Sequence, residues 1–365
     1  MPSLPPLRTL VRPGAVARAA LLGVAVGRFV RGTAAEAPMA PPARPAPDAP
    51  RAVVVVPARE EQDRIGPCVT ALVGQGAEVV VVDDGSTDRT REVAEAAGAT
   101  VVPAGPLPDG WAGKAHALDV GLRTVDAPVV VFVDADTRAR PGFVAAAVDA
   151  LGDATLVTAG AQVDAATPGE RWLHPSMLTS LVYRLGPPGV VPRRPSRTMA
   201  NGQCMVVDRR RLLDAGGFEP VRDALLEDLA LARSLAGRGH DVRFLDGTSV
   251  LQAAGYGSLE ETWRGWGRSL DLRAVTSPAW QALDLAVVWS AMALPLPRLL
   301  TGRGDAVDVA ALLIRTGTLV GTRGAYARRG LPYLLSPLAD VAVAARITLG
   351  TARPNRHWRG RTYTR

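Results

Sequence analysis

The sequence predicts an α/β fold in which helices cover both faces of a mostly parallel sheet. Short, continuously apolar runs rich in valine are typical of strands buried on both faces, and residues 52–60 and 129–137 contain two such runs. Helical segments alternate with these runs at the spacing of right-handed crossover connections. A chain of 365 residues can hold one large domain with appendages, or two domains.

Composition narrows the class of protein. The chain has 42 Lys+Arg against 35 Asp+Glu and a formal net charge of +7, which favours anionic partners such as phosphates or acidic lipids. No nucleic-acid-binding motif accompanies this charge, so we expect no nucleic-acid partner. The two cysteines, Cys68 and Cys204, lack metal-ligand spacing. This pattern suggests neither a disulfide framework nor a zinc site, and it fits a reducing compartment.

The first predicted strand, at residues 52–60, is stopped by Pro57, and a helix is expected at 61–74. The second strand, at 79–82, runs into two carboxylates, Asp83 and Asp84. A carboxylate at this end of a strand can accept hydrogen bonds from a ribose hydroxyl or a base imide. This half of the chain therefore predicts a nucleotide-binding arrangement.

The turn after Asp84 leads into the next predicted helix, at residues 88–97. Ser86 and Thr87 are placed to cap this helix, and a third short strand is expected at 100–102. No G-x-G-x-x-G follows the first strand, which disfavours a nicotinamide or flavin dinucleotide. A P-loop is also absent from the sequence.

A glycine-rich loop at residues 103–118 contains one aromatic and one ammonium group. Lys114 could meet a phosphate and Trp111 could cover a sugar or base. A surface loop with an anchoring tryptophan is the alternative. We expect His116, on a helix at 114–123, to be a partly buried structural residue.

The fourth predicted strand ends in Asp134 and Asp136. A hard divalent cation held by one or two carboxylates keeps positions open for phosphate oxygens, so this D-x-D can be a metal-diphosphate site or a solvated acidic loop. The pair Glu227 and Asp228 is ambiguous in the same way. It can supply a general base, or it can be a pair of acids that favours a helix N-terminus.

The two ends of the chain differ in character from the middle. Residues 36–50 have the composition of an extended linker, and residues 15–30 suit an interfacial or a plain surface helix. Beyond residue 280, three apolar stretches approach the length of a membrane span but are interrupted by Pro, Arg and Asp. They lie at 285–300, 307–322 and 331–350. We expect membrane association, because these stretches are consecutive and basic residues flank them. A helical subdomain packed on the catalytic core is the alternative.

Seven segments in this order resemble the family-2, inverting, nucleotide-sugar glycosyltransferases. They are PARE (57–60), VVDDGSTD (81–88), GWAGKAHALDVG (110–121), VFVDAD (131–136), NGQCMVVDRR (201–210), LLEDLALARSLAGRG (225–239) and WRGWGR (263–268). The GWAGK segment and the apolar C-terminal region are most similar to members that glycosylate carotenoid or hopanoid lipids. The resemblance implies a Rossmann-like fold of glycosyltransferase A type. It divides the chain into an N-terminal segment and linker (1–50), a catalytic domain (51–275) and apolar, membrane-associated helices with a basic tail (276–365).

The resemblance also implies roles for individual positions. Asp84, with Asp83 beside it, matches the carboxylate pair that binds the nucleoside. Asp136, assisted by Asp134, matches the D-x-D that holds Mg2+ or Mn2+ on the donor diphosphate. Asp228, beside Glu227, matches the general base.

Further donor-binding positions follow from the same resemblance. Pro57, Glu60 and Lys114 belong to matching segments, and Trp266 and Arg268 fall where the family carries an element against the diphosphate and acceptor. The usual Q-x-x-R-W spelling of that element is not present. Glu60 and Asp119 stand where relatives often have Asn.

The implied function is metal-dependent transfer of a sugar, with inversion, from a nucleotide-diphosphate sugar to a lipid. A UDP-sugar is the expected donor, and a carotenoid, hopanoid or other isoprenoid the expected acceptor. The expected location is the cytoplasmic membrane, with the catalytic domain in the cytoplasm. Alternatives are a polyprenyl-phosphate or polysaccharide acceptor, or a catalytically silent nucleotide-sugar-binding membrane scaffold. Residues 160–200, with Trp172 and His174, are expected to shape the acceptor pocket.

Overall fold

The computed structural model describes residues 14–34, 36–43, 49–270, 272–352, 357–358 and 361–362. The chain forms two compact units. The helical unit lies within residues 1–34, 165–187 and 255–355, and the sheet unit lies within 35–164, 188–254 and 356–365. Residues 165–187 and 255–275 therefore cluster with the helical unit, although the sequence assigns them to the catalytic domain.

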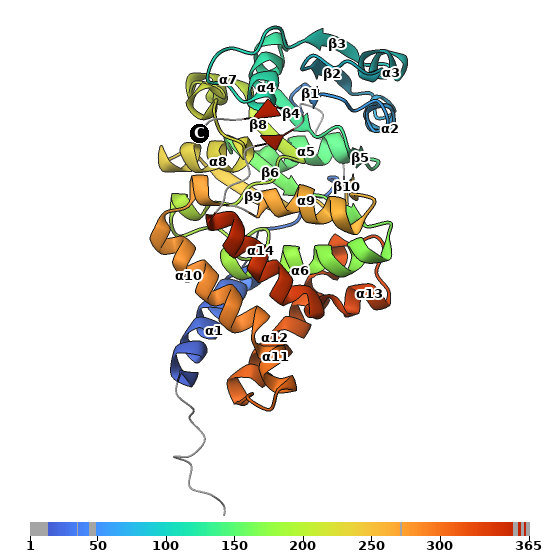
Figure 1. Ribbon diagram of the computed structural model, residues 1–365. Helices are drawn as coiled ribbons and strands as arrows, with labels where there is room; N and C mark the ends of the chain where they lie inside the picture. The colour runs from blue at the N-terminus through green and yellow to red at the C-terminus, as the bar shows by residue number, and fades with distance from the viewer. Residues whose placement is uncertain are drawn as a thin grey trace, which may run out of the picture. The chain divides into compact units, whose positions relative to one another are not determined.

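A seven-stranded sheet forms the centre of the sheet unit (Figure 1). The strand order is β3-β2-β1-β4-β8-β6-β9, and only β8 runs antiparallel to its neighbours. The strands are β1 (Ala52–Ala58), β2 (Glu78–Asp83), β3 (Thr100–Pro103), β4 (Val129–Val133), β6 (Leu156–Gly160), β8 (Cys204–Asp208) and β9 (Val242–Asp246). The prediction of a mostly parallel sheet is confirmed. A smaller sheet has the order β5-β10-β7, with β5 (Thr137–Ala139), β10 (Leu251–Ala254) and β7 (Gln162–Asp164).

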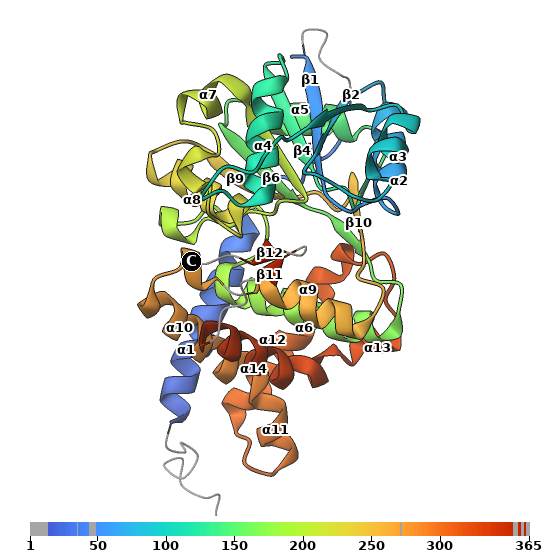
Figure 2. The ribbon, with the colours of Figure 1, turned by 45° about the horizontal axis from the view of Figure 1, so that its top comes forward.

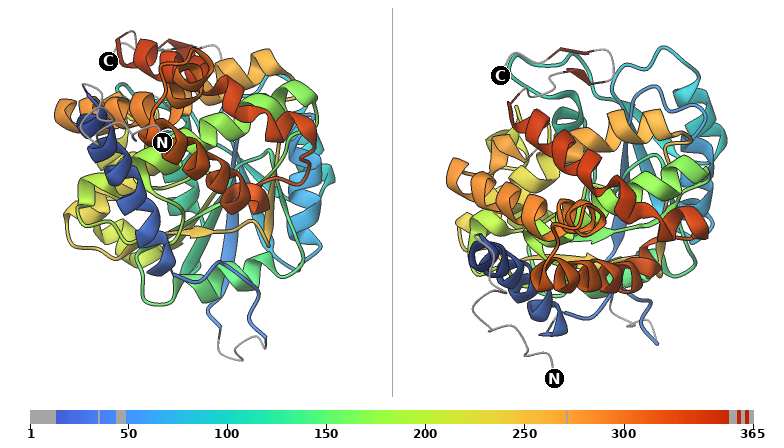
Figure 3. Two further views of the ribbon diagram at one scale, coloured as in Figure 1. Left: turned by 90° about the horizontal axis from the view of Figure 1, so that it is seen from below. Right: turned by 60° about the horizontal axis from the view of Figure 1, so that its bottom comes forward.

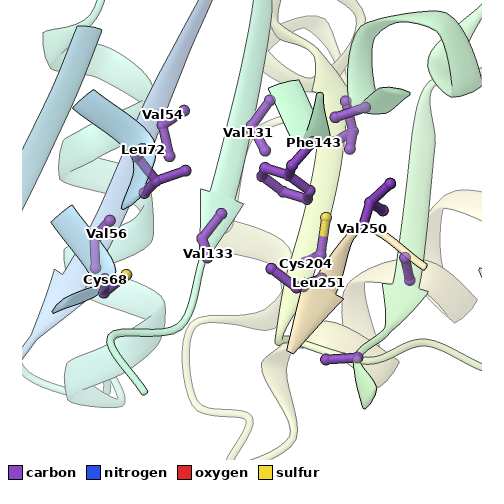
Figure 4. Close-up of a cluster of buried hydrophobic side chains, with 14 of the residues drawn as sticks. Val54, Val56, Cys68, Leu72, Val131, Val133, Phe143, Cys204, Val250 and Leu251 are labelled. Carbon is purple, nitrogen blue, oxygen red and sulfur yellow. The ribbon is translucent and has the colours of Figure 1, made fainter. Parts of the chain in front are cut away.

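Helices cover both faces of the large sheet, as predicted. The helices of this unit are α2 (Ile65–Val73), α3 (Thr90–Ala96), α4 (Gly113–Thr124), α5 (Phe143–Leu151), α7 (Arg209–Asp214) and α8 (Glu227–Gly237). Leu72 of α2 and Phe143 of α5 pack with Val54 and Val131 in one buried apolar cluster (Figure 4). Because side chains alternate across a strand, Val55 points to the opposite face, where α4 packs on β1 and β2 (Figure 2).

Pro57 does not end the first strand, contrary to the prediction. The pairing of β1 with β2 continues through Pro57 to Ala58, whereas the pairing with β4 ends at Val55. Proline removes one backbone donor from a strand. We attribute its tolerance here to its position beyond the end of the ladder to β4.

The predicted linker is extended in the part that the structure describes, and Met39 anchors it to the sheet unit. Met39 is 1% exposed. Its N–H donates to the carbonyl of Asp246 at 2.9 Å, and its carbonyl accepts from the Ser249 hydroxyl at 3.0 Å. Met39 therefore contributes a buried side chain and two hydrogen bonds to the contact between this segment and the rest of the sheet unit.

The helical unit consists of eight α-helices in the described part of the chain (Figure 3). They are α1 (Ala15–Val30), α6 (Pro168–Leu185), α9 (Leu259–Ser269), α10 (Pro278–Val288), α11 (Pro295–Leu300), α12 (Ala306–Thr322), α13 (Leu331–Leu334) and α14 (Asp340–Ala352). Among the described residues, no helix combines the length and apolarity needed to cross a membrane. Of the basic tail beyond α14, the structure describes only the short strands β11 (His357–Trp358) and β12 (Arg361–Thr362), which pair with each other.

Buried ion pairs explain the charges inside the apolar stretches of the helical unit. Arg315 of α12 donates to Asp340 of α14 at 2.8 Å, and the two side chains are 1% and 2% exposed. Arg28 of α1 pairs in the same way with Asp284 of α10 at 2.9 Å. Burying a charge is costly unless it is paired and hydrogen-bonded. These residues interrupt the hydropathy pattern because they hold helices together.

Candidate functional site

Four segments of the sheet unit bring a cluster of charged side chains together. Lys114 lies in the first turn of α4, Asp134 follows β4, and Glu227 and Asp228 begin α8. The Lys114 ammonium lies between Asp134 Oδ1, at 2.8 Å, and Glu227 Oε1, at 2.9 Å. The fourth segment supplies Gly202, just before β8, whose N–H donates to Asp228 Oδ2 at 2.7 Å. The sequence predicted Lys114, Asp134 and the pair Glu227 and Asp228 as separate site positions, and the structure places them in one cluster.

Gly202 lies against this cluster and leaves little room for a side chain. A Cβ at this position would lie 3.0 Å from Lys114 Nζ, 3.4 Å from Asp228 Oδ2 and 3.5 Å from Glu227 Oε1. A glycine at this position lets backbone approach its surroundings closely. In the structure, what it admits is the charged cluster itself.

The electrostatics of the cluster are mutually dependent. Burial lowers the pKa of Lys114, but the nearby carboxylates outweigh burial and raise that pKa well above 10.5. Burial raises the pKa of Glu227 from 4.5 to about 7, although Lys114 opposes the shift. Burial likewise raises the pKa of Asp228 above its ordinary value. A carboxyl group with a raised pKa is a stronger base than an ordinary one.

The turn after β4 contains the predicted metal ligands, Asp134 and Asp136. The Asp134 carboxylate already faces a cation, the Lys114 ammonium. The turn is fixed because the Thr137 N–H and hydroxyl donate to the Asp134 carbonyl at 3.0 and 2.7 Å, and the Asp136 carbonyl accepts from Ala254 N at 2.9 Å. Within the described part of the chain, no group of three or more His, Cys, Asp or Glu could hold a metal ion. The roles of Asp134 and Asp136 as metal ligands stay a prediction.

The turns after β1 and β2 hold each other. Glu60 has a φ of 55°, a left-handed conformation that is uncommon outside glycine and in which Asn is enriched. Its carboxylate accepts from the N–H and the hydroxyl of Thr87 at 2.8 and 3.1 Å, and its N–H donates to the Ser86 hydroxyl at 3.1 Å. The prediction that Ser86 and Thr87 cap the following helix is therefore wrong. Asp88 accepts from Thr90 N at 2.9 Å instead.

The predicted nucleoside carboxylates lie in the same turn. Asp83 Oδ1 accepts from Ser86 N at 3.0 Å, and Asp83 and Asp84 are 9% and 4% exposed. Arg59, which sequence reasoning did not assign, lies with its guanidinium 3.8 Å from Asp84 Oδ2 and donates to the Asp84 carbonyl. The position of Arg59 at a strand end, between the predicted site residues Pro57 and Glu60, could have indicated it from the sequence.

Asp119 and His116 on α4 have structural contacts. The Asp119 carboxylate accepts from Arg123 Nε at 2.7 Å and from Phe218 N at 3.1 Å. His116 is 8% exposed, and its ring meets that of Trp111 edge-on at 5.8 Å. Thus Asp119 ties α4 to a neighbouring segment, and His116 is buried, as the sequence predicted.

The remaining predicted site residues belong to the helical unit. Trp266 of α9 stacks on His174 of α6, with ring centroids 4.0 Å apart and an interplanar angle of 26°. The His174 Nδ1 also lies 2.9 Å from the Tyr326 hydroxyl, and burial lowers the pKa of His174 to about 3. The Arg268 side chain lies outside the described residues. The contribution of Trp266 and Arg268 to donor binding stays a prediction.

Neither cysteine has the character of a reactive thiol. Burial raises the pKa of Cys68 and of Cys204 to about 12, whereas reactive thiols have lowered pKa values. Both are free and buried in the structure. Cys204 is a packed residue of β8.

The mostly parallel sheet with helices on both faces places the sheet unit among the α/β domains. Residues 53–214 match the family model for glycosyl transferase family 2. The resemblance stated from the motifs is confirmed.

Two individual proteins show what the chain is similar to. One is a 4,4'-diaponeurosporenoate glycosyltransferase of Staphylococcus aureus (strain USA300), 42% identical over 86 residues, which are 23% of this chain and 23% of the relative. The other is the solved structure of a mannosyltransferase from Pyrobaculum calidifontis in complex with GDP-mannose and Mn2+. That likeness has a TM-score of 0.53 at 20% identity and covers 93% of this chain and 98% of the other, so it shows the shared fold.

Proposed function

We propose that this chain is an inverting glycosyltransferase that moves a sugar from a nucleotide-diphosphate sugar to a carotenoid, hopanoid or other isoprenoid lipid. In this proposal it acts at the cytoplasmic membrane, with its sheet unit in the cytoplasm and with Mg2+ or Mn2+ as cofactor. The observation that carries the proposal is the cluster at the strand ends. It holds one ammonium between two carboxylates, with a third carboxylate fixed beside them.

Asp228 is the proposed general base. Its Oδ2 accepts from Gly202 N and its Oδ1 from Leu229 N, each at 2.7 Å. These two bonds fix the orientation of the carboxylate and leave further lone pairs for the hydroxyl or carboxyl group of an acceptor. Burial raises the pKa of Asp228, which strengthens the base toward the acceptor proton.

Lys114 is the proposed group on the leaving side. A single in-line displacement needs positive charge where the diphosphate departs, and the Lys114 ammonium supplies it while Glu227 holds that ammonium in place. A metal ion held by Asp134 and Asp136 would act as a Lewis acid toward the leaving diphosphate. Asp83, Asp84 and Arg59 would then meet the nucleoside.

The relatives support different parts of this proposal. The Staphylococcus aureus protein is named for a carotenoid acid, which favours an isoprenoid acceptor, and the Pyrobaculum calidifontis structure holds GDP-mannose with Mn2+. A UDP-sugar remains our proposed donor, with GDP-sugars as the comparison. A polyprenyl-phosphate or polysaccharide acceptor, or a silent nucleotide-sugar-binding scaffold, are the alternatives.

The test is sugar transfer from UDP- and GDP-sugars to isoprenoid lipid extracts, with products identified by mass spectrometry. Asp228→Asn and Asp136→Ala should each lower the transfer rate by about 10²-fold or more. Asp149→Asn, an exposed carboxylate of α5, is the matched control and should transfer at the wild-type rate. Unchanged transfer by both site variants would contradict the mechanism. Binding of a nucleotide sugar without turnover by the wild type would favour the scaffold.

A further inference from the structure

The helical unit carries most of the exposed apolar surface. Among the described residues, only Val191 and Leu225 of the exposed large hydrophobic side chains belong to the sheet unit. The helical unit exposes many more, and six of them define what we call the leucine face. They are Leu300 (76%), Val309 (47%), Leu313 (69%), Val320 (59%), Leu331 (66%) and Leu334 (61%).

Helix α12 exposes apolar side chains and buries its charged ones, which is the opposite of an ordinary amphipathic surface helix. Val309, Leu313 and Val320 are spaced by four and seven residues, so they share one face, and that face is exposed. The charged residues of the helix, Asp308 and Arg315, are 0% and 1% exposed. Charge faces inward and apolar side chains face outward, the reverse of the usual arrangement.

The next helical segments repeat this arrangement. Leu331 and Leu334 of α13 are exposed, and so is Leu338 (56%) just after it, whereas Asp340, at the start of α14, is 2% exposed and bonded to Arg315. Figure 3 shows α12, α13 and α14 in two views. Large exposed apolar patches mark interaction sites.

The exposed charge of residues 276–352, which include the leucine face, has one sign. In residues 276–352 every carboxylate is nearly buried, and the set is Asp284 (4%), Asp305 (10%), Asp308 (0%) and Asp340 (2%). Each is paired with an arginine. The exposed charged side chains of this region are Arg303, Arg323, Arg328 and Arg329. The surface is therefore apolar and positive.

We propose that the leucine face docks on a bilayer that contains anionic lipids, with its apolar side chains at the acyl boundary and the four arginines at the level of the phosphates. Interfacial docking of this kind combines apolar burial with attraction to anionic headgroups. This inference deepens the proposed function, because it names the surface through which the enzyme would reach a lipid acceptor. A second copy of the chain is a poorer occupant, because no exposed carboxylate of residues 276–352 would meet the arginines.

The test is co-sedimentation of the full-length protein with vesicles of phosphatidylcholine, with and without phosphatidylglycerol. We expect binding that requires phosphatidylglycerol and weakens with salt. The double variants Leu313→Gln/Val320→Gln and Arg303→Gln/Arg323→Gln should each bind the vesicles at least about tenfold more weakly than the wild type. Two exposed sheet-unit positions give matched controls, Val191→Gln for the apolar pair and Arg210→Gln for the basic pair, and both should bind as the wild type does.

Three outcomes would overturn the docking proposal. In the first, the wild type does not sediment with the vesicles. In the second, the double variants bind as strongly as the controls. In the third, light scattering shows a dimer for the wild type and a monomer for Leu313→Gln/Val320→Gln. Stabilisation of the same preparations by a nucleotide with Mn2+ is measured in parallel. If that stabilisation persists while vesicle binding fails, only the docking is refuted. If vesicle binding persists while the nucleotide gives no stabilisation, the donor site is refuted and the docking proposal is not.

Discussion

Gly202 is the position where one added carbon should have the largest effect on the site. A Cβ would lie 3.0 Å from Lys114 Nζ and 3.4 Å from Asp228 Oδ2, so Gly202→Ala should displace the ammonium or the carboxylate. We expect sugar transfer to fall by about 10²-fold, because small misplacements of catalytic groups have effects of this size. Circular dichroism should show a folded protein. Gly237→Ala, where nothing lies within 4 Å, is the matched control.

Glu227 predicts how stability depends on pH. Its pKa is about 7 in the folded protein and near 4.5 without the fold, so the folded state binds the proton more tightly. Ionisation of Glu227 therefore lowers the free energy of unfolding as the pH rises from 4.5 to 7. Glu227→Gln cannot ionise and should lose less stability over this interval. Urea denaturation at pH 5 and pH 8 measures the free energy of unfolding of both proteins. An equal change with pH in the variant and the wild type would contradict the raised pKa of Glu227.

The sequence predicted most of the clustered residues but not their contacts. Lys114, Asp134, Glu227 and Asp228 were found because strand ends and motif order mark them. The bridge from Lys114 to Glu227 joins residues more than a hundred positions apart, which no local pattern shows. Glu60 was assigned to the donor, yet its carboxylate bonds Thr87. That contact depends on a left-handed φ that sequence patterns do not reveal.

Helix α4 carries Lys114 and packs closely on the sheet through Gly121. A Cβ at Gly121 would lie 2.4 Å from Val55 Cγ1 and 3.2 Å from Val82 Cγ2. Gly121→Ala should lower the free energy of unfolding by about 1–3 kcal/mol, the range for overpacked cores. Chemical denaturation measures the change. Gly23→Ala in α1, with open space around it, should be neutral or slightly stabilising, and equal effects of both would contradict the close packing.

The strands were predictable because valine runs such as that of β1 mark burial on both faces. Two properties of the elements could not be predicted from the sequence. One is the antiparallel direction of β8, whose chain connection from β7 includes residues 165–187 of the helical unit. The start of α3 depends on which polar side chain accepts its first N–H groups, and that acceptor is Asp88, because Ser86 and Thr87 bond Glu60.

At the scale of the molecule, the division into two units predicts that the helical unit can be weakened selectively. Asp340→Ala removes the partner of Arg315, which is 1% exposed, and loss of one member of a buried ion pair costs about 3–5 kcal/mol. We expect a lower unfolding transition for α12 and α14. Nucleotide stabilisation of the sheet unit should persist. Loss of that stabilisation together with the early transition would show that the units unfold as one.

The most direct test of the donor site is calorimetric titration of the full-length protein with UDP and with GDP, in Mn2+ or in chelator. The account predicts that one nucleotide binds in Mn2+, that chelator abolishes binding, and that Asp136→Ala weakens it at least tenfold while Asp149→Asn does not. A folded protein that binds neither nucleotide would contradict the account. So would binding that is equally tight in chelator and in Asp136→Ala.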